Sequence, residues 1–336
     1  MKKELPLAQL EPIKRHIRSK LLPKLGCNPD DFELVALDSG RRGPIILCKG
    51  NDNSFVFKMY RSPNRFLNAK KAHEYFAQQE LPSPHILHSQ LCIDVRAGFS
   101  RFLLVQEEVT GPGIHEIEDR DNAICETGKS LARMHSHKRE IPGRFHVIPY
   151  RRIRKKFKQK RSKFLGGRFN FAMSRLEQLE EGKAFTEAEG KNVARSLENA
   201  RSQIRDRNTH DLIHGDFGAS QIIMHNGKPT FIDLDTACFD NFGYELFSAK
   251  NSLCRTDSER ELLLNSYFAI AGVEALNWYN TAERFFELAY HIGRAKRYFK
   301  RSKGESEESG LSQFQQRYRF HKDQLMARSP RKLHSF

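Results

Sequence analysis

The first third of the chain carries short hydrophobic runs of the length and alternation that are typical of β-strands. Three such runs lie at Phe32–Leu37, Ile45–Cys48 and Phe55–Tyr60. A Gly- and Arg-rich break at residues 39–44 separates the first two, and a polar turn at residues 50–53 separates the last two. The pattern therefore predicts a three-stranded antiparallel meander.

One helix and two more strands are expected to complete this region. Ser62-Pro63 is a helix-start signal, and the helix can continue to about Gln79 before two prolines stop it. Further strand candidates lie near Leu91–Val95 and Phe102–Glu107. This part of the chain is therefore predicted to form a small sheet with one helix.

After residues 111–113 the periodicity becomes mainly helical. Amphipathic segments recur at Ile124–His137, Glu259–Ala271 and Ala282–Phe299. One strand–turn–strand patch interrupts them, because two short apolar runs, Ile222–Met224 and Thr230–Leu234, flank an Asn-Gly turn. A strand-rich first lobe followed by a helical second lobe with a small hairpin is the expected organisation, which is an α+β fold.

Composition narrows the class of protein. With 38% hydrophobic and 29% charged residues over 336 positions, a disordered chain or a coiled coil is excluded as the overall structure. The formal net charge is +16, which favours phosphates, anionic membrane surfaces or nucleic acid as partners. No apolar run approaches the roughly 18 residues of a membrane span, so a cytosolic protein is expected. Six cysteines without a CxxC pair favour free thiols over a zinc site or disulfides.

The side chains best suited to catalysis are concentrated in residues 212–236. This segment holds three carboxylates and one carboxamide on loops that flank short strands: Asp216, Gln221, Asp233 and Asp235. An aspartate on one loop can accept a hydroxyl proton, while an amide oxygen and a carboxylate on the next turn can hold a hard cation. An isolated His-Gly-Asp is a plain turn about as often as it is part of a catalytic site. The second Ile-Asp element, which follows through an Asn-Gly turn, favours a site.

Several motifs together resemble the aminoglycoside phosphotransferase and choline kinase family, which is related to protein kinases. His214-Gly215-Asp216, Gln221 and Phe231-Ile232-Asp233 resemble its catalytic and metal loops. Other parts of the chain match in the expected order: the strand Phe55–Lys58, Glu74 at 16 residues after Lys58, the inter-lobe segment Val105–Gly111, and the core helix Gly128–His135. The resemblance covers about residues 33–300.

The resemblance implies a bilobal, protein-kinase-like α+β fold. Its smaller lobe, an antiparallel sheet with one helix, is expected to bind nucleotide and to span residues 1–108. The mostly helical catalytic lobe is then expected to span residues 109–336, with a basic insert at about residues 150–168. ATP as the donor and Mg²⁺ as the cofactor are implied as well.

The resemblance also assigns roles to individual residues. Asp216 is implied to orient or deprotonate the acceptor hydroxyl, and His214 to brace its loop. Asp233 and Gln221, with Asp235 as a further candidate, are implied to bind magnesium. The implied nucleotide-binding residues are Lys58 with Glu74 as its ion-pair partner, the hinge residues Glu107 and Val109, and Ser39 and Gly40, which are placed over the phosphates by position alone.

Two departures from the family pattern matter for activity. Gln221 stands where the family normally has asparagine, and the extra methylene displaces the amide oxygen against the strict octahedral preference of Mg²⁺. The loop Ser39–Pro44 contains two arginines and is not a Gly-x-Gly-x-x-Gly sequence. The first departure motivates an alternative function, given below.

The segment from Tyr150 to Arg168 is strongly basic. It contains ten basic residues and no acidic one, and Ile153, Phe157 and Phe164 recur at helical spacing. Such a surface repels a cationic acceptor and attracts a phosphorylated sugar, an acidic glycan, a lipid head group or RNA. A solvated charged face without a ligand is the alternative interpretation.

The sequence thus predicts a phosphotransferase that moves the γ-phosphoryl group of ATP to a hydroxyl of an anionic or membrane-associated small-molecule or glycan acceptor. A cytoplasmic protein is expected, with peripheral contact to an anionic membrane through Arg151–Arg168; nucleic acid is the less favoured partner. One alternative is a catalytically weak kinase-like module that docks on membrane or nucleic acid. A protein kinase is a second alternative, although no activation-segment signature lies between Asp233 and Gly243.

Overall fold

The computed structural model describes residues 7–37, 43–51, 53–94, 99–145, 165–302 and 312–329. The chain forms two compact units. The first comprises Met1–Ser130, Gly143–Ile148 and His214–Cys238, and the second comprises Leu131–Pro142, Pro149–Ile213 and Phe239–Phe336. Within the described part of the chain, no helix is both long enough and apolar enough to cross a membrane.

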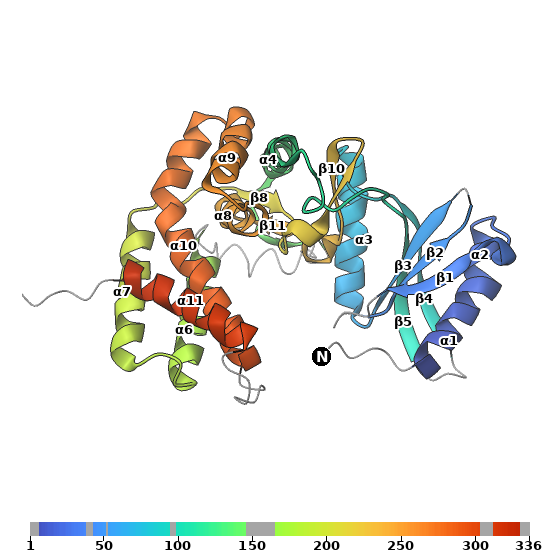
Figure 1. The fold of residues 1–336 in the computed structure, drawn as a ribbon, viewed down its shortest axis with the longest axis horizontal. Helices are drawn as coiled ribbons and strands as arrows, with labels where there is room; N and C mark the ends of the chain where they lie inside the picture. Colours follow the sequence, from blue (N-terminus) through green and yellow to red (C-terminus); the bar gives the residue numbers. More distant parts are fainter. Residues whose placement is uncertain are drawn as a thin grey trace, which may run out of the picture. The chain divides into compact units, whose positions relative to one another are not determined.

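The first unit is built on a five-stranded antiparallel sheet (Figure 1). Its strands lie in the order β1-β2-β3-β5-β4. Their bounds are β1 Glu33–Leu37, β2 Ile45–Lys49, β3 Ser54–Tyr60, β4 Ile86–Asp94 and β5 Phe99–Glu107. The predicted meander and the two further strands are confirmed, although β4 begins earlier than the alternation indicated.

Each face of this sheet is covered by a different helix, as alternating side chains require. Helix α3 (Pro63–Gln78) covers one face, where Phe66 and Ala69 pack with Tyr60 and Leu104. This is the helix predicted from Ser62-Pro63.

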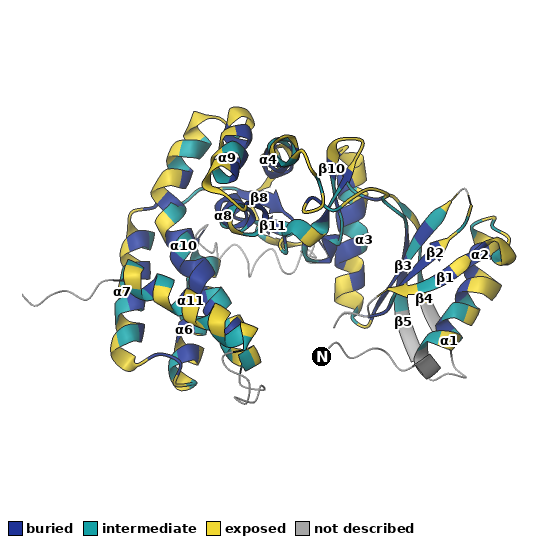
Figure 2. Cartoon of the chain, viewed as in Figure 1, coloured by how far each residue is buried: buried dark blue, intermediate teal, exposed yellow. Residues whose placement is uncertain are grey.

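The opposite face is covered by an N-terminal layer that the sequence patterns did not predict. The layer consists of α1 (Leu7–His16), the π-helical turn η1 (Ile17–Leu21) and α2 (Leu22–Lys24). Ile13, Ile17, Leu21 and Leu22 pack there against strand residues such as Phe57 and Val105. In Figure 2, strands β2 and β3 are mostly buried, whereas α1 and α2 carry exposed positions on their outer side.

The catalytic-loop segment of the first unit contains the predicted hairpin. Strands β9 (Ile222–His225) and β10 (Lys228–Phe231) pair antiparallel. Asn226 and Gly227 both have positive φ, 49° and 74°, as a tight two-residue hairpin turn needs. Short 3₁₀ turns lie at η2 (Pro29–Asp31), η3 (Ala219–Gln221) and η4 (Leu234–Thr236).

The second unit is helical, as expected for the region after residue 113. Its helices are α6 (Gly166–Glu181), α7 (Glu187–Ser202), α8 (Phe242–Leu253), α9 (Asp257–Ala271), α10 (Val273–Ser302) and α11 (Gln313–Arg328). The long α10 contacts α6, α7, α8, α9 and α11 and is the centre of this unit. Strand β6 (Lys138–Arg139) pairs with β8 (His210–Ile213).

Three elements lie where the chain passes between the units: α4 (Arg120–Ser136), β7 (Gly143–Arg144) and β11 (Cys238–Asp240). Helix α4 includes the predicted core helix. Its residue His135 is buried and forms hydrogen bonds with Tyr267 Oη (2.9 Å) and Glu245 Oε2 (3.1 Å).

Two sequence predictions concern other parts of the chain. The boundary between a nucleotide-binding and a catalytic lobe at residues 108 and 109 stays a prediction. The compact units divide the chain differently, because residues 214–238 pack with the first unit. Most of the basic insert lies outside the described residues. Of its ten basic side chains Arg168 is described, at the start of α6, where it forms an ion pair with Asp240 (2.6 Å).

Candidate active site

The first unit brings Lys58 of β3 to Asp233, the predicted metal ligand. Lys58 Nζ lies 3.7 Å from Asp233 Oδ1, and the lysine is 8% exposed. Its strand neighbours Phe57 and Met59 point into the opposite core, so alternation turns Lys58 to the α3 face of the sheet. The predicted phosphate-binding lysine and the predicted metal ligand therefore do meet.

The backbone around Asp233 is held by helix α3. Asp233 has left-handed φ and ψ of 65° and 52°, which is unusual for a residue other than glycine. The side chain of the buried Asn68 donates hydrogen bonds to the carbonyl oxygens of Asp235 and Ala237, both at 3.0 Å. The turn that presents Asp233 is thus anchored by a residue that the sequence interpretation missed.

His214 lies between the two loops and contacts both. It is fully buried, and its Nε2 donates to the carbonyl oxygen of Ile232 (2.8 Å). Because a carbonyl only accepts, Nε2 carries the proton. Thr236 Oγ1 donates in turn to the His214 carbonyl oxygen (3.1 Å). The strand end before Asp233 and the loop before Asp216 are therefore tied together through one histidine.

Gly215 lets the Asp216 loop lie close against the turn after Asp233. Its φ is +84°, and a Cβ atom there would come within 2.5 Å of the Thr236 carbonyl oxygen. Asp216 itself is half-buried. A glycine between His214 and Asp216 is required by this geometry.

The other predicted metal ligands have different surroundings. Gln221 is half-buried at the end of η3. Its backbone carbonyl accepts a hydrogen bond from the backbone amide of Ile232 (3.0 Å), and its side-chain Nε2 donates to Ser220 Oγ (3.3 Å). Asp233 is 29% exposed at its side chain, whereas Asp235 is 1% exposed. Asp233 is therefore the more accessible of the two carboxylates.

The chemistry of the Asp233 carboxylate fits Mg²⁺, which is usually bound by one or two carboxylates together with substrate phosphates. Over the described residues, no cluster of three or more His, Cys, Asp or Glu side chains with metal-binding geometry is found. A dedicated cage of protein ligands is accordingly not what this site provides.

Glu74 does not meet Lys58 in this structure. It lies half-exposed at its side chain on α3 and pairs with Lys70 (3.8 Å). The α3 residue nearest in sequence that does face the site is His73, which is 2% exposed and bonded through Nδ1 to the Pro84 carbonyl (3.0 Å). Burial, followed by the positive charge of Lys58, lowers the pKa of His73 to about 3, so the ring is neutral.

The predicted hinge continues from β5. The Glu107 carboxylate accepts from the His85 amide (2.9 Å), and no hydrogen bond between described residues uses the backbone N–H or C=O of Val109. Both residues line a pocket of about 470 Å³ together with Leu81 and His225, and neither Lys58 nor Asp233 lines it. The predicted phosphate-loop residues Ser39 and Gly40 lie outside the described part of the chain.

Sequence reasoning missed Asn68 and His73, although a signal was present. Both fall within the apolar stripe of α3, with Ala69, Ala72 and Phe76 buried around them. A polar side chain at a buried helix position needs a hydrogen-bond partner. The helical period therefore indicated that Asn68 and His73 make buried hydrogen bonds.

The chain matches one protein family and is similar in fold to several solved structures. A family described as "Phosphotransferase enzyme family" matches residues 33–279. The fold is similar to a thermostable mutant of aminoglycoside phosphotransferase APH(4)-Ia solved with ADP and hygromycin B (TM-score 0.62, 12% identity, 94% of this chain and 98% of that chain).

Two other solved structures share the fold. Amicoumacin kinase hAmiN, in complex with AMP-PNP, Ca²⁺ and Ami, has a TM-score of 0.60 and 13% identity, over 95% of this chain and 96% of that chain. Choline kinase from Cryptosporidium parvum Iowa II has a TM-score of 0.61 and 11% identity, over 95% of each chain. No curated protein sequence matches significantly. The family match covers most of the chain, which therefore belongs to the phosphotransferase enzyme family, whose kinases transfer phosphate from ATP with Mg²⁺ to hydroxyl groups.

Proposed function

We propose that this chain transfers the γ-phosphoryl group of ATP to a hydroxyl of a small anionic acceptor, with Asp216 as the catalytic residue. The acceptor oxygen forms a bond to the γ-phosphorus, the bond to the bridging oxygen breaks, and ADP leaves. Asp216 accepts the hydroxyl proton. The observation that supports this most directly is the approach of Lys58 to Asp233, beside a loop that holds Asp216 against the same turn.

Each remaining residue has a role that its surroundings support. Asp233 and Gln221, with Asp235 as the further candidate, would hold Mg²⁺, which would neutralise charge on the phosphate oxygens. Lys58 binds a phosphate oxygen when nucleotide replaces Asp233 as its partner. His214 keeps the two loops in register and moves no proton, because its protonated Nε2 already donates to a carbonyl.

The base of the nucleotide is assigned to the backbone of the hinge at Glu107 and Val109. The Val109 amide and carbonyl take part in no hydrogen bond within the described residues, so they are available to an adenine edge. Ser39 and Gly40 are proposed for the phosphates and Glu74 for a contact to Lys58, on the strength of the family resemblance alone.

The anionic class of acceptor rests on charge. The net charge of +16 and the ten basic residues of the insert attract an acidic molecule and repel a cation. Hygromycin B and choline, which the names of similar proteins mention, serve as comparison acceptors. The same insert, Arg151–Arg168, is proposed to reach an anionic membrane surface from the cytoplasm.

The test is Mg²⁺-dependent ATP consumption in the presence of panels of acidic, neutral and cationic alcohols. Asp216→Asn keeps the shape of the side chain and removes its basicity, so turnover with the best acceptor should fall by roughly 10²–10⁴-fold. Nucleotide affinity, measured by calorimetry, should stay within about two-fold of wild type. Unchanged turnover would contradict the assignment of Asp216, and preference for cationic acceptors would contradict the acceptor class.

A catalytically weak binding module is the second candidate, and Gln221 is the observation that favours it. Under that reading no acceptor in the panel raises ATP consumption above background, and Gln221→Asn restores turnover by shortening the amide to the length usual in the family. Gln221→Asn that lowers the turnover of an active wild type shows instead that the loop is adapted to glutamine.

A further inference from the structure

The second unit contains a polar pocket that the proposed phosphotransfer does not use. The pocket has a volume of about 880 Å³ and lies among the end of α8, the start of α9, residues 280–298 of α10 and residues 317–328 of α11. Ligand pockets in proteins are typically about 300–1,000 Å³ in volume. None of the residues that line it was assigned to nucleotide, magnesium or catalysis.

Its lining carries a surplus of positive charge. Five cationic side chains and three carboxylates face the pocket, which leaves two positive charges in excess: Lys250, Arg260, Arg284, Arg317 and Arg328 against Asp257, Glu283 and Glu287. Partly enclosed like charges strengthen each other's field on a ligand, because less water screens them. The surplus favours an anion with about two negative charges.

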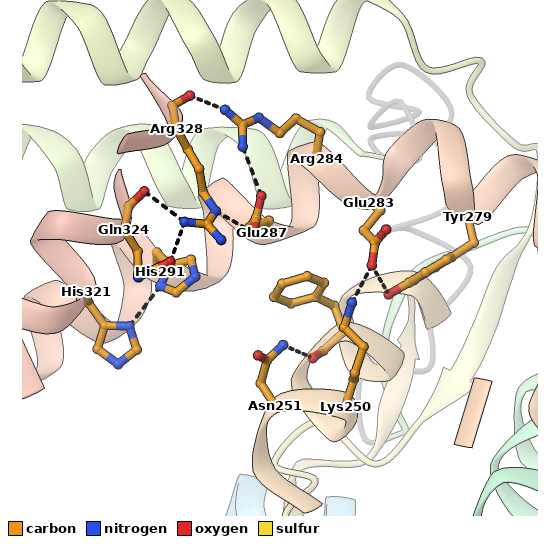
Figure 3. A network of polar contacts seen from close by, with 11 residues as sticks. Lys250, Asn251, Tyr279, Glu283, Arg284, Glu287, His291, His321, Gln324 and Arg328 are labelled. Carbon is orange, nitrogen blue, oxygen red and sulfur yellow. Dashed lines mark hydrogen bonds and ion pairs between the residues drawn. The ribbon is translucent and has the colours of Figure 1, made fainter. Parts of the chain in front are cut away.

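The pairing pattern shows where this surplus lies (Figure 3). Lys250 pairs with Glu283, and Glu287 accepts from both Arg284 (3.0 Å) and Arg328 (2.5 Å). Two arginines thus share one carboxylate. Arg317 has no carboxylate partner among the described residues, and its guanidinium donates a hydrogen bond to Tyr298 Oη (3.4 Å). An anion in the pocket would find its strongest partner at Arg317.

Two histidines of the lining, labelled in Figure 3, form a pair with unusual chemistry. His291 on α10 and His321 on α11 are 5% and 7% exposed, and their Nδ1 atoms lie 2.9 Å apart. Burial lowers the pKa of His291 to about 4 and that of His321 to about 3, so both rings are neutral near pH 7.

The tautomers of this pair follow from the contact. One Nδ1 must donate and the other must accept, so one Nε2 carries a hydrogen and the other carries a lone pair. No hydrogen bond between described residues uses either Nε2 atom. The pair therefore offers one donor and one acceptor to whatever enters the pocket, and a hydroxyl group can satisfy both kinds of site.

Aromatic rings supply the apolar part of the lining. Phe320 lines the pocket and is 55% exposed, so its ring is accessible to a ligand. Tyr298 and His321 are stacked with centroids 5.6 Å apart and planes at 5°. The carbon-bound face of a sugar or other polyol packs well on such rings.

We propose that this pocket binds a small phosphorylated polyol, with its phosphate on Arg317, a hydroxyl on the imidazole pair and its carbon face on Phe320. A phosphate monoester carries about −1.5 to −2 charges at pH 7, which matches the surplus of two. The proposal is independent of the proposed phosphotransfer, because it rests on residues of α8, α9, α10 and α11 alone.

The test compares two probes that differ by one phosphate group. D-glucose 6-phosphate and D-glucose are titrated by calorimetry into the full chain without ATP or magnesium. The sugar phosphate should bind saturably, and at least ten-fold more tightly than glucose. Affinity should fall when salt rises, because the contact is ionic. Glucose binding as tightly as its phosphate, or no saturable binding of the phosphate, would overturn the proposal.

Arg317→Gln and Arg319→Gln form a matched pair that locates the binding. Both remove one arginine from α11, but Arg319 does not line the pocket and takes part in no ion pair of the described residues. Arg317→Gln should weaken the sugar phosphate at least ten-fold, and Arg319→Gln less than two-fold. Equal losses in the two variants would mean that net charge alone attracts the probe and would sink the proposal. His321→Gln, checked for folding by thermal unfolding, should reduce the preference for glucose 6-phosphate over inorganic phosphate.

Discussion

The cluster around Asp233 in the first unit and the network of α8, α10 and α11 in the second are both polar, yet they are held in different ways. Backbone groups fix the first: His214 binds a carbonyl, Asn68 binds two, and a glycine allows close approach. Side chains fix the second, where Glu287 alone holds two arginines.

This difference has a consequence for mutation. In the first cluster His214, Asn68 and Thr236 tie the loops through backbone carbonyls, so replacing Asp216 or Asp233 should change the chemistry more than the fold. In the second the charged groups also join the helices, so replacing them should change binding and stability together. The predictions below use this contrast, and they run from the largest expected effect to the smallest.

Asp233→Ala should abolish the part of nucleotide affinity that depends on magnesium, because it removes the more accessible of the two carboxylates predicted to bind the metal. Calorimetric titration of a non-hydrolysable ATP analogue with and without Mg²⁺ measures this. The melting temperature should stay close to that of wild type, since the turn is anchored through Asn68 and not through the carboxylate. Equal magnesium dependence in variant and wild type would refute the metal assignment.

Acid should destabilise the protein through its buried neutral histidines. The pKa of His291 is lowered to about 4, and those of His73 and His321 to about 3, from 6.5. Below pH 6.5 these histidines become protonated in the unfolded chain but stay neutral in the folded one. Their contribution to the free energy of unfolding is therefore fully present above pH 6.5 and is lost as the pH falls towards 4. Each such group contributes up to about 1.4 kcal/mol per pH unit.

Urea unfolding at about pH 7 and about pH 5.5 measures this loss. His321→Gln should reduce the difference in unfolding free energy between the two pH values, because one buried neutral histidine has been removed. The matched control is His225→Gln, which replaces an exposed histidine and should leave the difference unchanged. A stability that is the same at both pH values in wild type would show that the rings are protonated in the fold.

Asn68→Ala should lower the free energy of unfolding by about 1–3 kcal/mol, because two buried carbonyls lose their donor. Asn64→Ala is the control, since Asn64 is exposed one turn earlier on the same helix. Asn68→Ala should also weaken nucleotide binding by loosening the Asp233 turn. Equal losses of unfolding free energy in the two variants would mean that the hydrogen bonds of Asn68 do not stabilise the Asp233 turn.

Glu74→Gln should have the smallest effect. Its pair with Lys70 is exposed, and such pairs contribute about 0.5 kcal/mol or less on a helix. Unfolding free energy should therefore hardly change. If nucleotide affinity nevertheless falls ten-fold or more, Glu74 reaches Lys58 once nucleotide is bound, as the family resemblance implies. An unchanged affinity assigns the α3 side of the site to His73 and Asn68.

The elements that the sequence predicted correctly are those whose cause is local. Alternation set the meander of β1, β2 and β3, Ser62-Pro63 set the start of α3, and Asn226-Gly227 set the hairpin. The motif residues Lys58, His214 and Asp233 also came together, because strand alternation and one tight loop are enough to aim them.

The rest depended on contacts between distant segments. The spacing from Lys58 favoured Glu74, but the packing of α3 placed that residue outside the buried stripe and His73 inside it. The layer at residues 7–24 was missed although Ile13, Ile17 and Leu21 recur at helical spacing, and its prolines, Pro12 and Pro23, argue against a helix until the sheet face that it covers is known. The His291–His321 pair joins two helices, and no pattern along the chain reports such a contact.

The N-terminal layer also affects how the protein is made. Ile13, Ile17 and Leu21 leave the ribosome well before their partners on β5, such as Leu103 and Val105. At synthesis rates of about 5–20 residues per second, this apolar stripe stays uncovered for several seconds. The stripe can be fully covered only when the fifth strand has emerged.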